Sequence, residues 1–273
     1  MIGVFDSGVG GLSVWKELVA LMPGQRYMYV SDSGFCPYGP RSKSYVIERC
    51  KRISEFLICN GADLIVVACN TATAASIEVL RSTYEIPFVG MEPAVKPAAL
   101  QSESGVIGVL ATQGTLKGEL YLRTLHKFAA NTSVIEQVGN GLVELVERGE
   151  TYTPQAFELL ESYIKPMLQA GADHIVLGCT HYPFLSAAIE KIAGSGVKIV
   201  NPAPAIARQA KSLLSMGGKS IDLSVGKNMF YTTGKNLPLL EKMVTDVVEE
   251  LFKEGKLRSD LYVRDKRFCS IDI

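Results

Sequence analysis

Short apolar runs alternate along the chain with longer segments in which apolar residues recur every three or four positions. The runs suited to strands cover residues 2–5, 27–31, 64–68, 86–90, 106–110, 133–138, 174–178 and 197–200. The helical patterns between them cover residues 11–22, 42–59, 72–82, 115–129, 154–169, 184–193 and 204–216. This alternation predicts an α/β fold of mainly parallel sheets flanked by helices.

One ten-residue segment occurs twice. Gly61–Asn70 recurs as Gly171–Thr180, and each copy reads as an acidic turn, a short apolar run, a cysteine and a small polar residue. Two weaker matches extend the repeat: residues 2–5 resemble 107–110, and residues 93–95 resemble 204–206. A period of this length indicates a duplicated α/β half.

The first half ends near residues 98–104, where a polar stretch separates two apolar ones. The chain passes between the halves a second time near residues 205–210. A strand at 229–233 and a helix at 237–253 follow, and the pattern leaves open which half they join.

Right-handed crossovers place the carboxyl ends of parallel strands on one side, where ligands of open α/β sheets bind. Four chemically useful side chains follow strand ends: Asp6, Cys69, Thr112 and Cys179. Two facing lobes would bring the two thiols across one cleft.

Composition narrows the class of protein. The 273 residues are 47% hydrophobic and 21% charged, which is ordinary for a globular protein. Lys+Arg and Asp+Glu balance at 28 each, so no basic field argues for nucleic acid or an anionic membrane. The chain starts without a basic leader and holds no run of eighteen apolar residues, so we expect a cytoplasmic location. The six cysteines form no CxxC pair, so we expect reduced thiols and no metal site.

Each repeated cysteine sits where a strand passes into a helix. Amides at the start of that helix favour anions, so we expect a lowered pKa for the Cys69 thiol; the alternative is that Cys69 is a small buried hydrophobe. Around Cys179, the predictions are Pro183 in a first helical turn and His181 as an acid–base partner of the thiol. The alternative for His181 is a helix-capping or surface histidine.

Two loops also carry candidate chemistry. Phe5–Gly11 is a strand end with a glycine loop, but Ser13 stands where the dinucleotide fingerprint needs glycine. The glycines would instead let the backbone approach a small ligand while Asp6 points into the cleft, unless Asp6 simply caps the helix. Residues 35–40 must form an irregular loop because they contain two prolines and a glycine. Its Tyr38 either closes over a substrate or packs on a neighbouring helix.

Six segments of the chain, taken in order, resemble the glutamate racemases of the cofactor-independent aspartate/glutamate racemase superfamily. The resemblance covers nearly the whole chain. A histidine after Cys179-Thr180 is similar to glutamate racemases, whereas aspartate-specific relatives more often carry glutamate there. The segments that carry the resemblance are Phe5-Asp6-Ser7-Gly8 with Gly10-Gly11, Pro37-Tyr38-Gly39, Cys69-Asn70-Thr71, Glu92-Pro93-Ala94, Ala111-Thr112-Gln113-Gly114-Thr115 and Gly178-Cys179-Thr180-His181-Tyr182-Pro183.

The resemblance implies two pseudo-symmetric α/β domains with the active site between them. The first domain would be residues 1–97 plus 208–273, and the second residues 98–207. The implied activity is the interconversion of L- and D-glutamate without a cofactor, which supplies D-glutamate for bacterial peptidoglycan. Glutamate would be the small-molecule partner, with no nucleic acid and no membrane; a homodimer is compatible with the family.

The resemblance also implies roles for individual residues. Cys179 would remove the α-proton of L-glutamate and Cys69 would reprotonate the other face, with Asp6 assisting Cys69 and His181 assisting Cys179. Asp6 and His181 would also contact the substrate, together with Ser7, Tyr38, Gly39, Asn70, Thr71 and Thr180. Further candidates for substrate contacts are Glu147, Thr112 and Thr115.

The chain departs from the family at two places. Asn140-Gly141 stands where many relatives have Cys-Pro, and Gly118 replaces a frequent serine. Near the first of these, Glu147 aligns with an acidic pocket residue, but Glu144, Glu147 and Glu150 also fit a solvated helix face. The tail 257–273 carries no family motif.

Three other functions compete with the resemblance. A racemase or isomerase of the same superfamily would act on aspartate or another acid. A binding or regulatory module would keep the cleft without catalysis, since some relatives act on DNA gyrase. A thiol hydrolase would use Cys179 and His181 but would leave Cys69 without a role.

Overall fold

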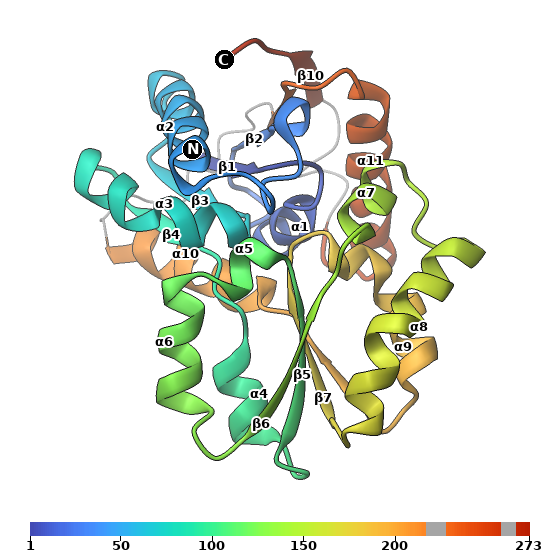
Figure 1. The fold of residues 1–273 in the computed structure, drawn as a ribbon. Coiled ribbons are helices and arrows are strands. Elements are labelled where there is room, and N and C mark those ends of the chain that lie inside the picture. Colours follow the sequence, from blue (N-terminus) through green and yellow to red (C-terminus); the bar gives the residue numbers. More distant parts are fainter. Residues whose placement is uncertain (217–227, 258–265) are drawn as a thin grey trace.

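Two parallel sheets flanked by helices form the framework of the computed structural model, which describes residues 1–216, 228–257 and 266–273. The predicted α/β class is therefore confirmed. Figure 1 shows the two sheets one above the other, with α4 and α6 on one side of the second sheet and α8 and α9 on its other side.

The first sheet has six strands, and all their pairings are parallel. In order across the sheet they are β10 (Lys266–Ser270), β9 (Asn228–Thr232), β2 (Tyr27–Ser31), β1 (Ile2–Asp6), β3 (Leu64–Val67) and β4 (Phe88–Gly90). The second sheet has four parallel strands. They are β6 (Ser133–Val138), β5 (Val106–Ala111), β7 (His174–Gly178) and β8 (Lys198–Val200).

The strand order confirms the duplication that the sequence predicts. The order β2-β1-β3-β4 in the first sheet matches β6-β5-β7-β8 in the second. The registers agree as well, since Val4 pairs with Val66 in one half and Val109 with Val176 in the other. Because β3 and β7 occupy equivalent places, the cysteines that follow them are structurally equivalent.

The helices lie between the strands, largely where the pattern predicts them. They are α1 (Leu12–Leu21), α2 (Lys43–Cys59), α3 (Asn70–Thr83), α4 (Val95–Gln101), α5 (Gln113–Leu116), α6 (Glu119–Phe128), α7 (Leu142–Glu147), α8 (Pro154–Gln169), α9 (Ser186–Ala193), α10 (Ala203–Met216) and α11 (Leu237–Lys253), with 3₁₀ turns η1 (Ser33–Phe35) and η2 (Tyr182–Leu185).

Three local predictions differ from the structure. The single helix predicted over 115–129 is divided into α5 and α6, because Gly118 between them has extended backbone angles. The short helices α4 and α7 were not predicted, since each is only about two turns long and offers little periodicity. Part of the tail forms β10, whereas residues 258–265 lie outside the described residues.

The chain returns to the first sheet at its end. β9 pairs with β2, and β10 pairs with β9, so the segment whose place the sequence left open extends the first half. The boundaries at residues 97–98 and 207–208 stay our proposal for the two domains.

A shared hydrophobic core joins the two halves. Its largest cluster contains the fully buried Trp15 from the first half and Leu142 and Tyr182 from the second. Trp15 meets Phe230 edge-to-face, with ring centroids 5.1 Å apart. The described helices include none that is both long and apolar enough to cross a membrane.

Asp173, at the turn before β7, ties the loop between the halves to the second sheet. Its carboxylate accepts hydrogen bonds from the Glu103 and Ser104 amides (2.7 and 2.9 Å), from Ser102 Oγ (2.7 Å) and from His174 Nδ1 (2.8 Å). Burial opposes ionisation, but these hydrogen bonds hold the pKa of Asp173 well below its usual range.

We predict that Asp173→Asn lowers the free energy of unfolding by about 1–2 kcal/mol at neutral pH, because an amide cannot accept all of these hydrogen bonds. A lowered pKa in the folded state means that the stabilisation is complete above the ordinary aspartate pKa of about 3.9 and is lost as the pH falls below it. Urea unfolding at pH 7 and pH 3 should therefore show the difference shrinking in acid. Asp246→Asn, on the exposed side of α11, is the control. Equal stability of Asp173→Asn and wild type at pH 7 would refute the prediction.

Candidate active site

The two repeated cysteines lie at equivalent strand ends and face one cavity. Cys69 caps the N-terminus of α3 just after β3, and Cys179 directly follows β7. The two residues are 5% and 6% exposed, and both line one small cavity. The predicted meeting of two thiols across a cleft is thus what the fold produces.

Most residues that the sequence assigned to the site line this cavity, and Asp6 and Glu147 are the exceptions. Besides the two cysteines, the predicted residues on its walls are Ser7, Tyr38, Gly39, Asn70, Thr71, Thr112, Thr115, Thr180 and His181. Three lining residues were not predicted as site residues: Pro37, Val143 and Gly178. They provide shape and apolar surface, for which a short motif gives little signal.

Asn70 carries the clearest sign that the cavity is built for a polar ligand. Its side chain is 3% exposed, yet neither its amide nitrogen nor its oxygen has a hydrogen-bond partner. A buried polar group without a partner costs free energy. Since Asn70 lines the cavity, a bound ligand would supply the missing partners. Nearby, the hydroxyl groups of Thr71, Thr112 and Thr115 form a chain with oxygen separations of 2.8 and 2.9 Å.

The surroundings of Cys69 oppose ionisation of its thiol. Its Sγ accepts a hydrogen bond from the Ala72 amide (3.4 Å) at the start of α3 and lies 3.7 Å from Ser7 Oγ. Burial and the nearby Asp6 carboxylate nevertheless raise the pKa of Cys69 well above its usual value. The prediction of a lowered pKa is therefore wrong, because loss of hydration and a neighbouring negative charge outweigh the helix start.

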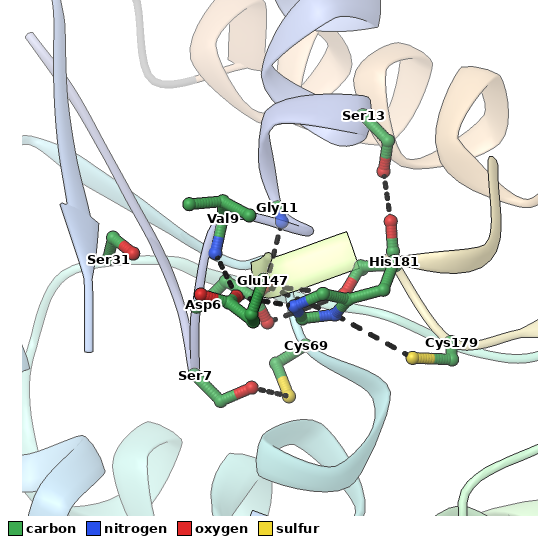
Figure 2. Close-up of polar contacts among 12 residues, drawn as sticks. Asp6, Ser7, Val9, Gly11, Ser13, Ser31, Cys69, Glu147, Cys179 and His181 are labelled. Carbon is green, nitrogen blue, oxygen red and sulfur yellow. Dashed lines mark hydrogen bonds and ion pairs between the residues drawn. The ribbon is translucent and has the colours of Figure 1, made fainter. Parts of the chain in front are cut away.

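Cys179 pairs with His181, as predicted. The distance from Cys179 Sγ to His181 Nδ1 is 3.8 Å, and the other ring nitrogen, Nε2, lies 2.8 Å from Glu147 Oε1. Burial lowers the pKa of His181, but hydrogen bonds to Cys179, Cys36 and Glu147 raise it well above the ordinary value. The residue is only 1% exposed, so it is not a surface histidine. His181 takes the N-cap position of η2, but its side chain makes no capping hydrogen bond. Figure 2 shows His181 between Glu147 and Cys179.

Glu147 belongs to the site rather than to a solvated helix face. At the end of α7, it accepts hydrogen bonds from the Val9 amide (2.7 Å) and from Ser33 Oγ (3.2 Å) besides its contact with His181. Its neighbour Glu144 is exposed, so the solvated-face alternative holds for Glu144 and is wrong for Glu147. This carboxylate fixes the orientation of the imidazole from behind the cavity.

Asp6 lies behind the cavity wall instead of pointing into the cleft. Fully buried, its carboxylate accepts from the Gly11 amide (2.7 Å) and from Thr180 Oγ1 (3.3 Å), and Oδ2 is 4.0 Å from His181 Nδ1. Burial raises the pKa of Asp6 to about 6, although His181 and a hydrogen bond with Cys69 oppose that shift. Asp6 thus stands between the two thiol sites.

The glycine loop after β1 packs closely against side chains of the other half. Its predicted approach to a ligand stays a prediction. A Cβ atom on Gly8 would lie 1.9 Å from Glu147 Oε1, and one on Gly10 would lie 2.2 Å from His181 Nδ1. Ser13, which breaks the dinucleotide fingerprint, donates its hydroxyl to the Thr180 carbonyl (2.9 Å). The loop therefore positions the residues that follow β7.

Tyr38 packs in one hydrophobic cluster with Val46 and Cys50 of α2, as one of the two alternatives predicts. Its closure over a substrate stays a prediction. Tyr38 is 1% exposed, lines the cavity from the irregular loop, and donates its hydroxyl to Asp32. Asp32 in turn accepts two hydrogen bonds from the Arg49 guanidinium (2.7 and 3.0 Å), whose plane lies over the Phe35 ring. Neither Asp32 nor Arg49 stands in a recognisable motif, so no sequence pattern indicated that this pair supports Tyr38.

The sequence matches one family model over most of its length. Residues 11–210 match the family described as Asp/Glu/Hydantoin racemase. The chain is 43% identical over 249 residues to the glutamate racemase of Ralstonia pickettii (strain 12J), which covers 91% of this chain and 88% of that one. It is 50% identical over 214 residues to the glutamate racemase of Ectopseudomonas mendocina (strain ymp), covering 78% and 81% of the two chains.

Solved structures agree with the sequence matches. The crystal structure of the glutamate racemase isoform RacE1 from Bacillus anthracis has a TM-score of 0.83 at 31% identity and covers 100% of this chain and 97% of its own. That of Escherichia coli glutamate racemase in complex with L-glutamate and the activator UDP-MurNAc-ala has a TM-score of 0.81 at 32% identity, covering 90% and 94%.

We predict that Arg49→Met lowers the free energy of unfolding by about 3–5 kcal/mol, because it leaves the buried Asp32 carboxylate without its counter-charge. The side chains of this pair are 6% and 0% exposed. Arg52→Met on the same helix is the matched control: the Arg52–Glu48 pair is 56% and 61% exposed, so its loss should change stability by less than about 0.5 kcal/mol. Urea unfolding of both variants is the measurement, and similar effects would show that the buried pair has no special role.

Proposed function

The chain belongs to the Asp/Glu/Hydantoin racemase family, and we infer from this that it is a glutamate racemase that moves protons between two cysteines and the substrate. Relatives named glutamate racemase share 43–50% of their residues with it. The observation that carries the two-cysteine mechanism is that Cys69 and Cys179, from equivalent strand ends, line one cavity. Inversion at Cα needs a base on one face and an acid on the other, and a duplicated fold supplies both.

In the direction from L- to D-glutamate, the Cys179 thiolate takes the α-proton and becomes a thiol. The Cys69 thiol then donates its own proton to the opposite face of Cα and becomes a thiolate. His181 Nδ1, 3.8 Å from Cys179 Sγ, accepts or returns the proton of that thiol between turnovers. On the other side, Asp6 exchanges a proton with Cys69. The reverse reaction uses the same groups in opposite roles.

The raised pKa of Cys69 suits this assignment. A thiol that holds its proton is ready to act as the acid, and once ionised it is a strong base for the reverse direction. The α-proton of an amino acid is very weakly acidic, so the carbanion-like transition state needs preorganised donors. Asn70, with no partner of its own, and the neighbouring Thr71 and Thr180 are the side chains we assign to the substrate's carboxylates and amino group.

Glutamate is favoured over aspartate because the similar proteins are named glutamate racemase and one solved relative holds L-glutamate. The resulting D-glutamate would serve peptidoglycan synthesis in the cytoplasm. A thiol hydrolase would need only Cys179 and His181, whereas the cavity also presents Cys69. A binding module is not favoured, because it would need neither buried thiol.

We predict that Cys69→Ala and Cys179→Ala each lower the rate of glutamate racemisation by about 10²–10⁴-fold or more, because each removes one of the two proton carriers. The change in optical rotation of purified protein with L- or D-glutamate measures this rate, and aspartate in parallel tests the substrate. Cys59→Ala, at the exposed end of α2, is the control and should keep wild-type activity. Full turnover by both single variants would overturn the mechanism.

A second prediction concerns the glycine loop. Gly10→Ala should lower kcat by about 10–100-fold with little change in KM, because its Cβ would lie 2.2 Å from His181 Nδ1 and displace the imidazole from Cys179. Gly196→Ala is the control, since a Cβ there meets no atom within 4 Å. If Gly10→Ala folds and retains wild-type kcat, His181 does not act where we place it.

A further inference from the structure

A third thiol lies beside His181 and has no part in the proton transfers. Within residues 1–216, 228–257 and 266–273, Cys36, Glu147 and His181 form a group whose possible ligand atoms all lie within 4.8 Å of one another. They come from the irregular loop after η1, the end of α7 and the segment after β7. A thiol, an imidazole and a carboxylate are a donor set that Zn²⁺ prefers.

We propose that Cys36, Glu147 and His181 bind a zinc ion, and that this ion inhibits the enzyme. Zinc bonds of about 2.0–2.3 Å in a tetrahedral arrangement put neighbouring donor atoms about 3.3–3.7 Å apart. The Glu147 Oε1–His181 Nε2 distance of 2.8 Å must therefore open slightly, while the thiol closes from at most 4.8 Å. Small side-chain rotations achieve both. The fourth position stays open for water.

Hydrogen bonds already hold the Glu147 carboxylate in place beside His181. Glu147 accepts hydrogen bonds from the Val9 amide (2.7 Å) and Ser33 Oγ (3.2 Å), and ligands fixed by such outer contacts bind metals better. Charge also favours a cation, because the fully buried Asp6 lies 4.0 Å from the same imidazole. Zinc would replace two protons, one from the Cys36 thiol and one from the His181 ring, and these leave to solvent.

The expected inhibition rests on the proposed function. It follows from which nitrogen of the His181 ring binds the zinc ion. Glu147 faces Nε2, so an ion shared with Glu147 binds there. The single proton of the ring then sits on Nδ1, which faces Cys179 Sγ at 3.8 Å. With Nδ1 protonated and Nε2 metallated, His181 can no longer accept the proton of the Cys179 thiol. Zinc would thus stop proton transfer without contacting either catalytic thiol.

The test compares wild type, Cys36→Ser and Cys59→Ser. A serine hydroxyl at position 36 preserves size and hydrogen bonding but is a poor zinc ligand, and Cys59 is an exposed thiol outside the group. Calorimetry with Zn²⁺ gives affinity and stoichiometry, and Co²⁺ reports a bound thiolate through its near-ultraviolet charge-transfer band. Racemisation is measured with and without Zn²⁺, and again after a chelator is added.

Wild type and Cys59→Ser should bind one zinc ion and show the cobalt–thiolate band, and zinc should inhibit both reversibly. Cys36→Ser should keep its basal activity, lose the band, bind zinc at least about tenfold more weakly and resist inhibition. No zinc binding by wild type, or unchanged binding and inhibition in Cys36→Ser, would overturn the proposal; the latter outcome would place the inhibitory zinc on other ligands.

The proposal stays testable even if the Cys36→Ser variant does not fold. If thermal unfolding shows that Cys36→Ser is not folded, zinc binding to Glu147→Gln decides, since unchanged affinity there would equally refute the site. The metal readouts do not depend on racemisation. Zinc binding by a protein that racemises nothing would refute the proposed function and keep the site, whereas an active racemase without zinc binding would do the reverse.

Discussion

The contact between the glycine loop after β1 and the segment after β7 holds the active site together. Ser13 Oγ donates to the Thr180 carbonyl, and the Val9 amide donates to Glu147. Glu147 in turn orients His181. This packing is possible only because Gly8 and Gly10 carry no Cβ. Each half thus completes the other's thiol site, and the cavity between Cys69 and Cys179 depends on their close approach.

Burial dominates the chemistry of this site. It raises the pKa of the Cys69 thiol and brings that of Asp6 to about 6, so proton carriers near Cys69 hold their protons more firmly than in water. Hydrogen bonds reverse the effect of burial at His181, whose pKa is raised. Proton exchange among closely spaced buried groups is what inversion at a weakly acidic carbon requires. The unpartnered amide of Asn70 lies where we propose that the reacting molecule binds.

The sequence predicted the features that depend on local pattern. The repeated segments predicted that β3 and β7 are equivalent, and the predicted strand ends indicated where both cysteines lie. Contacts between distant segments could not be predicted from the sequence. These include His181 with Glu147, Arg49 with Asp32, and Cys36 beside His181. The sequence predicted no metal site, and the three donors that we propose for zinc share no spacing motif. The predicted shift in the pKa of Cys69 was wrong in direction, because tertiary packing determines how deeply the thiol is buried and how close it lies to Asp6.

The most direct test of the two-thiol mechanism is to follow L-glutamate in D₂O and analyse both enantiomers early in the reaction. Two separate proton carriers predict that D-glutamate forms with deuterium at Cα while the remaining L-glutamate keeps its protium. The reason is that Cys179 holds the proton it removed, and Cys69 delivers one from solvent. D-Glutamate that retains protium, or L-glutamate that gains deuterium as fast as the product forms, would contradict the account and point to a single shared base.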